Sequence, residues 1–337
     1  MFEKYLITGA SGFLGRAVIS ELKKKNARIS ALVLENDPLA KELSQDISIT
    51  YGDVCDDETL THFFSDANNQ TCVIHCAGIV SLASRPDDRI YTVNVGGTNN
   101  ILRHCEKNNV GKLIYVSSVH AIPEKTKGTQ ITENAVFLPS LVKGDYGKSK
   151  AIATNLVFEA AKRGLNANVV FPSGIVGPGD IGKGSITNML LSFLKGKLPF
   201  AVKGAYDFVD VRDVAAGIVA CAEHGQQGRG YILSGQYAYI RDILNAAEEA
   251  LHIKRRVIFL PICLAKTIAP ICEKWSLKKK RPLYFTPYSV SVLDSNGLFS
   301  KKAAAKTFGY SPRSLKSSIR DTVLWLKKHP KTLSLST

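Results

Sequence analysis

Hydrophobic and polar positions along the first half of the chain follow the order strand, amphipathic helix, strand. Short apolar runs predict strands at residues 4–8, 28–34, 47–51, 72–76, 112–117 and 168–171. Between them, apolar residues recur at helical spacing and predict helices at residues 12–25, 57–64, 91–108 and 146–163. This α/β order predicts a doubly wound parallel sheet, with a ligand crevice at the carboxyl ends of its strands.

The pattern changes after residue 171, where Gly and Pro become frequent and residues 172–180 are predicted to form a loop. Further on, the pattern predicts strands at 206–209 and 231–234 and helices at 185–195, 212–223, 239–251 and 315–328. Residues 252–300 contain several prolines and show only weak amphipathic periodicity. We therefore expect a core at residues 1–171 and a smaller lobe at 172–337, with segments around 206–235 returning to the core.

The composition is that of a soluble globular protein, because 45% of the 337 residues are hydrophobic and 22% are charged. The sequence shows neither a signal-peptide pattern nor an apolar run of the ~18 residues that span a membrane, so we expect a cytoplasmic protein. The seven cysteines form no C-x-x-C pair, and the seven histidines show no paired spacing. We expect reduced thiols and no metal site.

A net charge of +15 would suit an anionic partner. The lysines are nevertheless spread along the chain, without the interleaved aromatic residues of a base-stacking surface, so we expect no nucleic acid partner. The densest basic region, residues 254–280, suits either a membrane-surface element or a substrate lid. Because Pro261 and Pro270 are expected to interrupt an amphipathic helix there, we favour the lid and expect no membrane contact.

The strongest motif is a glycine-rich turn, Thr8–Gly15, between the first predicted strand and the first predicted helix. Gly9 suits a tight turn, Gly12 lets a pyrophosphate approach the backbone, and Gly15 lets the helix pack closely on the strand. The start of the helix then presents backbone N–H groups and its dipole to a phosphate. Glu35 follows Gly15 by twenty positions, where a carboxylate accepts from ribose hydroxyls. The turn therefore predicts a dinucleotide site.

Tyr146 and Lys150 occupy positions i and i+4 of a predicted helix and therefore share one face. A phenol with its usual pKa of ~10 is a weak base at neutral pH, but a nearby ammonium and an oxidised nicotinamide lower that pKa. Ser118 ends an apolar strand at the crevice and adds a hydroxyl. A Tyr and a Lys at this spacing, without other motifs nearby, would more often face solvent on an amphipathic helix. Combined with the glycine turn, the three residues predict proton transfer to and from a substrate oxygen.

Together these motifs resemble the extended short-chain dehydrogenases/reductases of the NAD-dependent epimerase/dehydratase family. The resemblance is strongest to the dihydroflavonol-reductase-like and 3β-hydroxysteroid-dehydrogenase-like branch, and it covers nearly the whole chain. It includes the segments Gly52–Val54, His75–Gly78, Asn94–Thr98, Pro172–Ile175 and Asp207–Val214. The resemblance implies a Rossmann fold that binds NAD(P) through residues 1–171, with a substrate-binding lobe at 172–337.

The resemblance also assigns roles to individual residues. It implies that Tyr146 is the general acid/base and that Ser118 steadies the substrate oxygen. It implies that Lys150 lowers the tyrosine pKa and holds the nicotinamide ribose, and that Asn94 helps to hold Lys150 through a water. Besides Lys150, the cofactor-binding residues that it implies are Gly9, Ser11, Gly12, Phe13, Leu14, Gly15, Leu34, Glu35, Asp53, Val54, Cys76, Ala77, Gly78, Pro172 and Ile175.

Two departures from the epimerase-like members bear on the substrate. Gly174 stands where those members carry an Asn that contacts the sugar nucleotide, and Tyr206 stands where they carry a diphosphate-binding Arg. Apolar residues between 258 and 271 suit a hydrophobic ligand or a lobe core. We therefore expect an NAD(P)-dependent oxidoreductase that interconverts a carbonyl and an alcohol on a small to medium, fairly apolar substrate. The alternatives are a nucleotide-sugar epimerase or dehydratase with bound NAD, and a non-catalytic dinucleotide sensor.

The choice between NAD and NADP stays open, with NAD slightly favoured. Leu34 stands where NADP-preferring relatives often have Arg, and Val33 where NAD-preferring relatives often have Asp. Glu35 would repel a 2′-phosphate, whereas Arg16 or Lys41 would attract one. The resemblance also implies a homodimer formed through the two helices that are predicted at 91–108 and 146–163.

Overall fold

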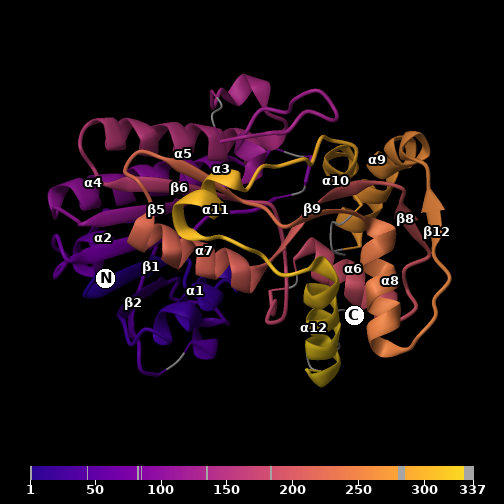
Figure 1. Ribbon diagram of the computed structural model, residues 1–337, viewed down its shortest axis with the longest axis horizontal. Helices are drawn as coiled ribbons and strands as arrows, with labels where there is room; N and C mark the ends of the chain where they lie inside the picture. The colour runs from indigo at the N-terminus through magenta and orange to yellow at the C-terminus, as the bar shows by residue number, and fades with distance from the viewer. Residues whose placement is uncertain are drawn as a thin grey trace.

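Seven parallel strands form the central sheet in the order β10-β6-β5-β4-β1-β2-β3 (Figure 1). The computed structural model describes residues 2–43, 45–81, 83–84, 86–133, 136–182, 184–279 and 285–329. The strands are β1 (Lys4–Thr8), β2 (Arg28–Val33), β3 (Ser48–Tyr51), β4 (Thr71–His75), β5 (Lys112–Val116), β6 (Ala167–Pro172) and β10 (Gly230–Leu233). The strand order reverses between β1 and β4, which places a ligand crevice at their carboxyl ends. The prediction of a doubly wound parallel sheet is confirmed.

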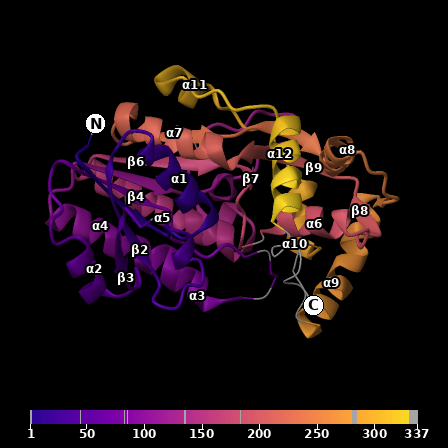
Figure 2. The same ribbon diagram turned by 90° about the horizontal axis from the view of Figure 1, so that it is seen from below.

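Helices cover both faces of the sheet (Figure 2). One face carries α1 (Phe13–Lys23), α7 (Val211–His224) and α11 (Lys302–Phe308), and the other carries α2 (Asp57–Phe63), α4 (Thr98–Lys107) and α5 (Gly144–Lys162). Successive residues of β1 point to opposite faces, so Ile7 joins the apolar cluster of α1 and α7 while Leu6 joins that of α2, α4 and α5. Burial on both faces explains why these strands are continuous apolar runs.

The helix predicted at residues 91–108 is divided into α3 (Asp88–Tyr91), a π-helical turn (Thr92–Gly97) and α4. At Gly97 a Cβ would lie 2.6 Å from Cγ2 of Val54, so this turn packs directly on the segment after β3. The turn also buries the side chain of Asn94. Periodicity does not reveal a single π-helical turn, because it shifts the helical phase only locally.

Short strands and further helices build the C-terminal lobe (Figure 1). A three-stranded sheet contains β7 (Gly174–Val176), β9 (Ala205–Asp210) and β11 (Gln236–Tyr239), and β8 (Phe200–Val202) pairs with β12 (Ile258–Leu260). The helices are α6 (Ser185–Leu194), α8 (Ile240–Leu251), α9 (Ile262–Lys278), α10 (Pro287–Leu293) and α12 (Leu315–Lys328). The prediction of a loop across 172–180 is wrong for β7, because pairing with β9 outweighs the low strand propensity of Gly.

Helix α9 runs past Pro270 without a break, so the prediction that prolines interrupt a helix here is wrong. Pro261 stands at the N-cap, where an intrahelical N–H is not needed. On the inner face, the buried Ala265 and Ala269 pack with Val290, and this packing offsets the hydrogen bond that Pro270 cannot donate. Along the described ranges, no helix is both long and apolar enough to cross a membrane.

Candidate active site

A pocket of about 510 Å³ opens at the carboxyl ends of the central strands and extends towards the C-terminal lobe. The residues predicted for the site that line it are Gly9, Gly12, Phe13, Leu14, Gly15, Cys76, Gly78, Ser118, Tyr146, Lys150, Pro172 and Ile175. Leu34, Glu35 and Asp53 line a second pocket beside the ends of β2 and β3. The other predicted residues, Ser11, Val54, Ala77 and Asn94, line neither of these two pockets.

The turn between β1 and α1 requires glycine at two positions. Gly9 has a φ of +64°, and a Cβ there would lie 2.7 Å from the backbone nitrogen of Ala77. A Cβ at Gly15 would lie 2.2 Å from the carbonyl oxygen of Gly9. Gly12 is the N-cap of α1, and this helix start has neither a side-chain cap nor an acidic residue in its first turn. Its first N–H groups and its dipole therefore suit a diphosphate.

A buried chain of hydrogen bonds joins the ends of β1 and β4 to α4. The hydroxyl of Thr8 accepts from the N–H of Ala77 at 3.2 Å and donates to Nδ1 of His75 at 2.7 Å. Nε2 of His75 then donates to the hydroxyl of Thr98 at 3.0 Å, and Thr98 donates to the carbonyl of Asn94 at 2.7 Å. This order of donors assigns the proton of the neutral ring to Nε2. Burial, assisted by the nearby ammonium of Lys150, lowers the pKa of His75 to about 3.

The structure brings Ser118, Tyr146 and Lys150 together at the floor of the main pocket. Ser118 lies close enough to Tyr146 for its hydroxyl to lower the pKa of the phenol. Nζ of Lys150 donates to the carbonyl oxygen of Val116 at 2.8 Å and lies 4.9 Å from the centre of the Tyr115 ring. The end of β5 thus positions Ser118, while one turn of α5 separates Tyr146 from Lys150.

Burial dominates the acid–base properties of this floor. It raises the pKa of Tyr146, and the nearby hydroxyl of Ser118 opposes that rise. Burial also lowers the pKa of Lys150 to about 8, so this side chain is still mostly an ammonium at neutral pH. We expected the ammonium to lower the tyrosine pKa, but among the protein's own groups the desolvation of the phenol is the larger effect. Tyr146 is therefore a protonated phenol at neutral pH.

The side chain of Asn94 makes hydrogen bonds beside the floor of the main pocket. Its Oδ1 accepts from the N–H of Ile79 at 2.7 Å, and its Nδ2 donates to the carbonyl of Ile79 and to Oγ of Ser149, each at 3.0 Å. A Cβ at Gly78 would lie 3.0 Å from Oδ1 of Asn94 and 3.3 Å from Nζ of Lys150. Asn94 thus ties the segment after β4 to helix α5 beside Lys150.

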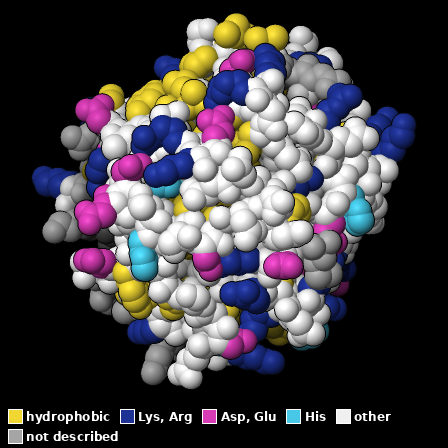
Figure 3. Space-filling view, turned by 90° about the vertical axis from the view of Figure 1, so that its left-hand side faces the viewer, with side chains coloured by type: hydrophobic (Ala, Val, Ile, Leu, Met, Phe, Trp, Pro, Cys, Tyr) yellow, Lys and Arg dark blue, Asp and Glu magenta, His cyan; other side chains and the backbone are white. Residues whose placement is uncertain are grey.

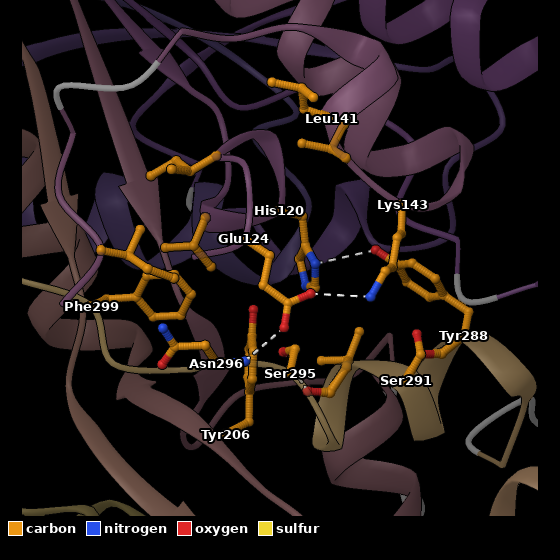
Figure 4. Close-up of a pocket in the computed structure, with 15 residues that line it drawn as sticks. His120, Glu124, Leu141, Lys143, Tyr206, Tyr288, Ser291, Ser295, Asn296 and Phe299 are labelled. Carbon is orange, nitrogen blue, oxygen red and sulfur yellow. Dashed lines mark hydrogen bonds and ion pairs between the residues drawn. The ribbon is translucent and has the colours of Figure 1, made fainter. Parts of the chain in front are cut away.

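Sequence reasoning missed His120, which follows Ser118 by two positions. Its ring stacks on Tyr206 with centroids 5.7 Å apart and meets the Tyr146 ring edge-on at 5.8 Å. Nδ1 of His120 is hydrogen-bonded to the hydroxyl of Tyr288 at 3.1 Å (Figure 4). Burial lowers the pKa of His120 to about 4. Its place just beyond a strand end was a usable signal, whereas Tyr288 is far away in the sequence.

A small cavity of about 70 Å³ lies on the other side of His120 (Figure 4). There the carboxylate of Glu124 accepts from Nζ of Lys143 at 3.1 Å and from the backbone N–H of Asn296 at 3.0 Å. His120 and Tyr206 line both this cavity and the main pocket. These two rings therefore form part of the wall between the small cavity and the main pocket.

The outer part of the main pocket is apolar. Its walls include Met189, Leu198, Phe200, Val202, Phe208, Ile240, Phe285, Val292 and Leu293. Among the described residues that line it, Lys150 is the only Lys or Arg. Both departures noted in the sequence face this space: Tyr206 is buried against His120, and a Cβ at Gly174 would lie 3.0 Å from the carbonyl oxygen of Asp207.

The residues that cover the apolar part come from 285–293 and not from the segment that we expected to act as a lid. Phe285, Ser289, Val292 and Leu293 reach the pocket. Residues 254–279 contribute no lining side chain to it. The lid prediction is therefore wrong for that segment, because α10 lies between α9 and the pocket.

Asp207 anchors the segment that follows β6. It accepts from the hydroxyl of Ser173 and, at 2.8 Å, from the N–H of Gly235. Burial raises its pKa to about 6, and these hydrogen bonds oppose the rise. The carboxylate thereby holds the backbone that carries Gly174 and Ile175 into the main pocket.

The second pocket is acidic. Glu35, Asp37, Asp53 and Asp56 line it, and none of its described lining residues is Lys or Arg. Sequence reasoning missed Asp37, which accepts a hydrogen bond from the hydroxyl of Ser11. Of the two cations considered for a 2′-phosphate, Arg16 donates to the carbonyl of Gly179 instead and Lys41 does not line the pocket.

Comparisons with known proteins agree with the resemblance that the motifs indicated. The model of the NAD dependent epimerase/dehydratase family matches residues 5–234. The chain is 26% identical to sterol demethylase protein B of Methylococcus capsulatus, over 96% of this chain and 98% of that protein. It is 28% identical to sterol-4-alpha-carboxylate 3-dehydrogenase, decarboxylating, of Schizosaccharomyces pombe, over 95% and 97%. The crystal structure of gox2253 is similar with a TM-score of 0.84 at 27% identity, over 97% and 98%.

Proposed function

The chain belongs to the NAD dependent epimerase/dehydratase family, and from this premise we propose that it interconverts a secondary alcohol and a ketone on a bulky, apolar, sterol-like substrate. One observation carries the proposal: Ser118, Tyr146 and Lys150 meet at the floor of a pocket whose outer walls are apolar. Its only Lys or Arg among the described lining residues is Lys150, at the floor. A carbonyl or hydroxyl group would reach this floor while the rest of the substrate contacts the apolar walls.

The residues around the glycine turn fit a dinucleotide. The uncapped start of α1 would hold the diphosphate, Glu35 would accept from the adenosine ribose, and Lys150 would hold the nicotinamide ribose. When bound, NAD supplies the acceptor for the hydride that leaves the carbinol carbon.

In ketone reduction the phenol of Tyr146 donates its proton to the substrate oxygen. In alcohol oxidation its phenolate form, which the ammonium of Lys150 and the positive charge of an oxidised nicotinamide would favour, accepts the proton of the substrate hydroxyl. The hydroxyl of Ser118, which lies beside Tyr146 on the pocket floor, donates to the same oxygen and keeps it in line with the phenol. Lys150 is fixed on the same pocket floor by its bond to Val116, and its ammonium would favour the negative charge that forms on the phenol oxygen.

The acidic second pocket supports NAD over NADP. A 2′-phosphate on the adenosine ribose would enter a space lined by four carboxylates, among them Glu35 and Asp37. Repulsion between like charges opposes binding of the phosphorylated cofactor, whereas ribose hydroxyls can donate to the same carboxylates.

The pocket also supports an apolar substrate over a nucleotide sugar. A diphosphate buried in the outer part would need an Arg or Lys partner there, and Tyr206 and Gly174 stand at the two positions that bear on this choice. The two relatives named for sterol reactions agree with an apolar ring system.

Purified protein incubated with NAD and a 3β-hydroxysteroid tests the proposal, with NADH formation followed by absorbance. We expect turnover of the steroid and none of UDP-glucose or dTDP-glucose. Tyr146→Phe should slow turnover by about 10²–10⁴-fold, because it removes the proton-transfer group. Its NAD affinity, measured by thermal shift, should stay close to that of the unchanged protein. The matched control is Tyr51→Phe, an exposed tyrosine at the far edge of the sheet.

Each alternative has its own outcome. Conversion of a nucleotide sugar without turnover of the steroid overturns the substrate class. Full activity of Tyr146→Phe overturns the mechanism. NAD binding without turnover of any secondary alcohol in a broad panel overturns the enzymatic proposal in favour of a dinucleotide sensor.

A further inference from the structure

Helix α9 exposes an apolar stripe on the side away from its packed face. Ala265 and Glu273 are buried on the inner side. Leu264, Ile271 and Trp275 are 46%, 69% and 49% exposed. Their positions i, i+7 and i+11 fall on one face of a helix. The stripe therefore faces outward along nearly the whole length of α9.

The charges that accompany this stripe are all positive. Lys274, Lys278 and Lys279 are exposed along its C-terminal half. The single carboxylate of α9, Glu273, is buried and accepts from the backbone N–H of Ser84 at 2.8 Å. The outer surface of α9 is thus apolar and cationic. At the opposite end of the molecule, Lys, Arg, Asp and Glu side chains are interspersed (Figure 3).

The position of α9 connects this surface to the main pocket. Both ribbon views place α9 at the end of the molecule remote from β2 and β3 (Figures 1 and 2). Its inner face packs with Val202 and Val290, and Phe285 and Leu293 pack against the same apolar cluster. Val202, Phe285 and Leu293 also line the main pocket. Helix α9 is therefore the outer layer over the apolar wall of that pocket.

We propose that α9 lies in the surface of an anionic lipid bilayer, with its apolar stripe among the acyl chains and its lysines at the headgroups. An exposed amphipathic helix with a basic border binds in this way without crossing the membrane. Attraction of its lysines to acidic lipids adds to the burial of Leu264, Ile271 and Trp275. The contact places the apolar wall of the main pocket next to the phase in which a sterol-like molecule dissolves; this consequence rests on the proposed function.

Charge complementarity distinguishes a membrane from a second copy of the chain. Two α9 helices packed through their stripes would bring two lysine-bordered faces together without an exposed carboxylate of α9 to pair with them, which opposes association. An anionic lipid surface attracts the same side chains and accepts the apolar stripe between them.

Co-sedimentation of the full chain with vesicles tests this proposal. The probes are vesicles of phosphatidylcholine alone and of phosphatidylcholine mixed with phosphatidylserine. We expect binding to the mixed vesicles, weaker binding to the neutral ones, and a loss of binding as the salt concentration rises.

Two sets of substitutions separate the apolar and the electrostatic contributions. Lys274→Gln/Lys278→Gln should weaken binding to mixed vesicles about 30-fold, from about fivefold for each lysine near an anionic surface. Ile271→Ser should weaken binding on the order of tenfold to both kinds of vesicle, because its apolar area no longer leaves water. The matched controls are Lys302→Gln/Lys306→Gln, an i, i+4 pair on α11, and Leu324→Ser, a 38% exposed leucine on α12.

The controls should bind like the unchanged protein, and thermal melting should show that every variant is folded. Absence of binding to both vesicle types, or equal losses in the α9 and control variants, overturns the proposal. A dimer that Ile271→Ser dissociates in light scattering, without vesicle binding, identifies an interface between copies and also overturns it. Because sedimentation needs neither cofactor nor turnover, its outcome is independent of whether the protein oxidises a steroid.

Discussion

The glycine turn and the apolar part of the main pocket are adjacent in space, yet the sequence specifies them in different ways. The turn is local: within seven residues, Gly9 supplies a positive φ, Gly12 starts α1, and Gly15 admits the carbonyl of Gly9. The apolar walls are assembled from distant elements, with Phe200 from β8, Phe285 before α10 and Leu293 from α10. A site made of backbone geometry is fixed by a short motif, whereas a site made of side-chain packing is fixed only by the folded chain.

Each of the two regions also contains one neutral histidine whose pKa is lowered by burial. His75 crosslinks the cofactor region through Thr8 and Thr98, and His120 joins the substrate region through Tyr206 and Tyr288. The comparison predicts that the two rings respond to pH alike although their surroundings differ.

Acidification from pH 7 to pH 5 should reduce the free energy of unfolding by about 3 kcal/mol in chemical denaturation. Burial holds the pKa of His75 at about 3 and of His120 at about 4, below the ordinary value of 6.5. Between pH 7 and pH 5 both histidines bind protons in the unfolded chain but stay neutral in the folded chain. This difference lowers the free energy of unfolding by about 2 kcal/mol for each ring. Asp207, whose pKa is raised to about 6, binds a proton in the folded state over the same pH range. This proton uptake stabilises the folded chain and offsets about 1 kcal/mol of the loss.

The variants His75→Asn and His120→Asn separate the two regions. Each should remove about 2 kcal/mol of the pH-dependent loss, and each should do so independently of the other. If neither variant alters the pH dependence of stability, the two histidine rings are not its source.

Gly15→Ala should destabilise the fold by about 3 kcal/mol and abolish NAD binding. The added Cβ would meet the carbonyl oxygen of Gly9 at 2.2 Å, and the backbone of the turn has to move to relieve this overlap. Gly96→Ala is the matched control, because a Cβ there meets nothing within 4 Å. Thermal melting with and without NAD measures both effects. Retained NAD binding in Gly15→Ala would show that the turn tolerates a shift and is not fixed by its backbone geometry.

The difference between locally specified and long-range structure also explains which parts could be predicted from the sequence. The central strands were predicted to within a few residues because they are continuous apolar runs between recognisable turns. Ser118, Tyr146 and Lys150 were identified because strand ends and i, i+4 spacing place them on one crevice. The strands β7, β8 and β12 have only three residues each, too few to show a period of two. Helix α9 was missed because a proline rule was applied without the inner-face packing of Ala265 and Ala269.

The smallest expected effect concerns the substrate region alone. Phe285→Ala should raise the KM for a steroid about tenfold, because part of a Phe side chain's burial energy of ~1.5–3 kcal/mol is lost. It should leave both kcat and the affinity for NAD close to their original values, because Phe285 reaches the apolar wall and not the glycine turn. Steady-state kinetics with the steroid and NAD varied separately measures this split. Leu324→Ala, an exposed residue on α12, is the control and should change neither constant. An equal loss of NAD affinity in Phe285→Ala would mean that the two regions form one energetic unit, despite being specified in such different ways.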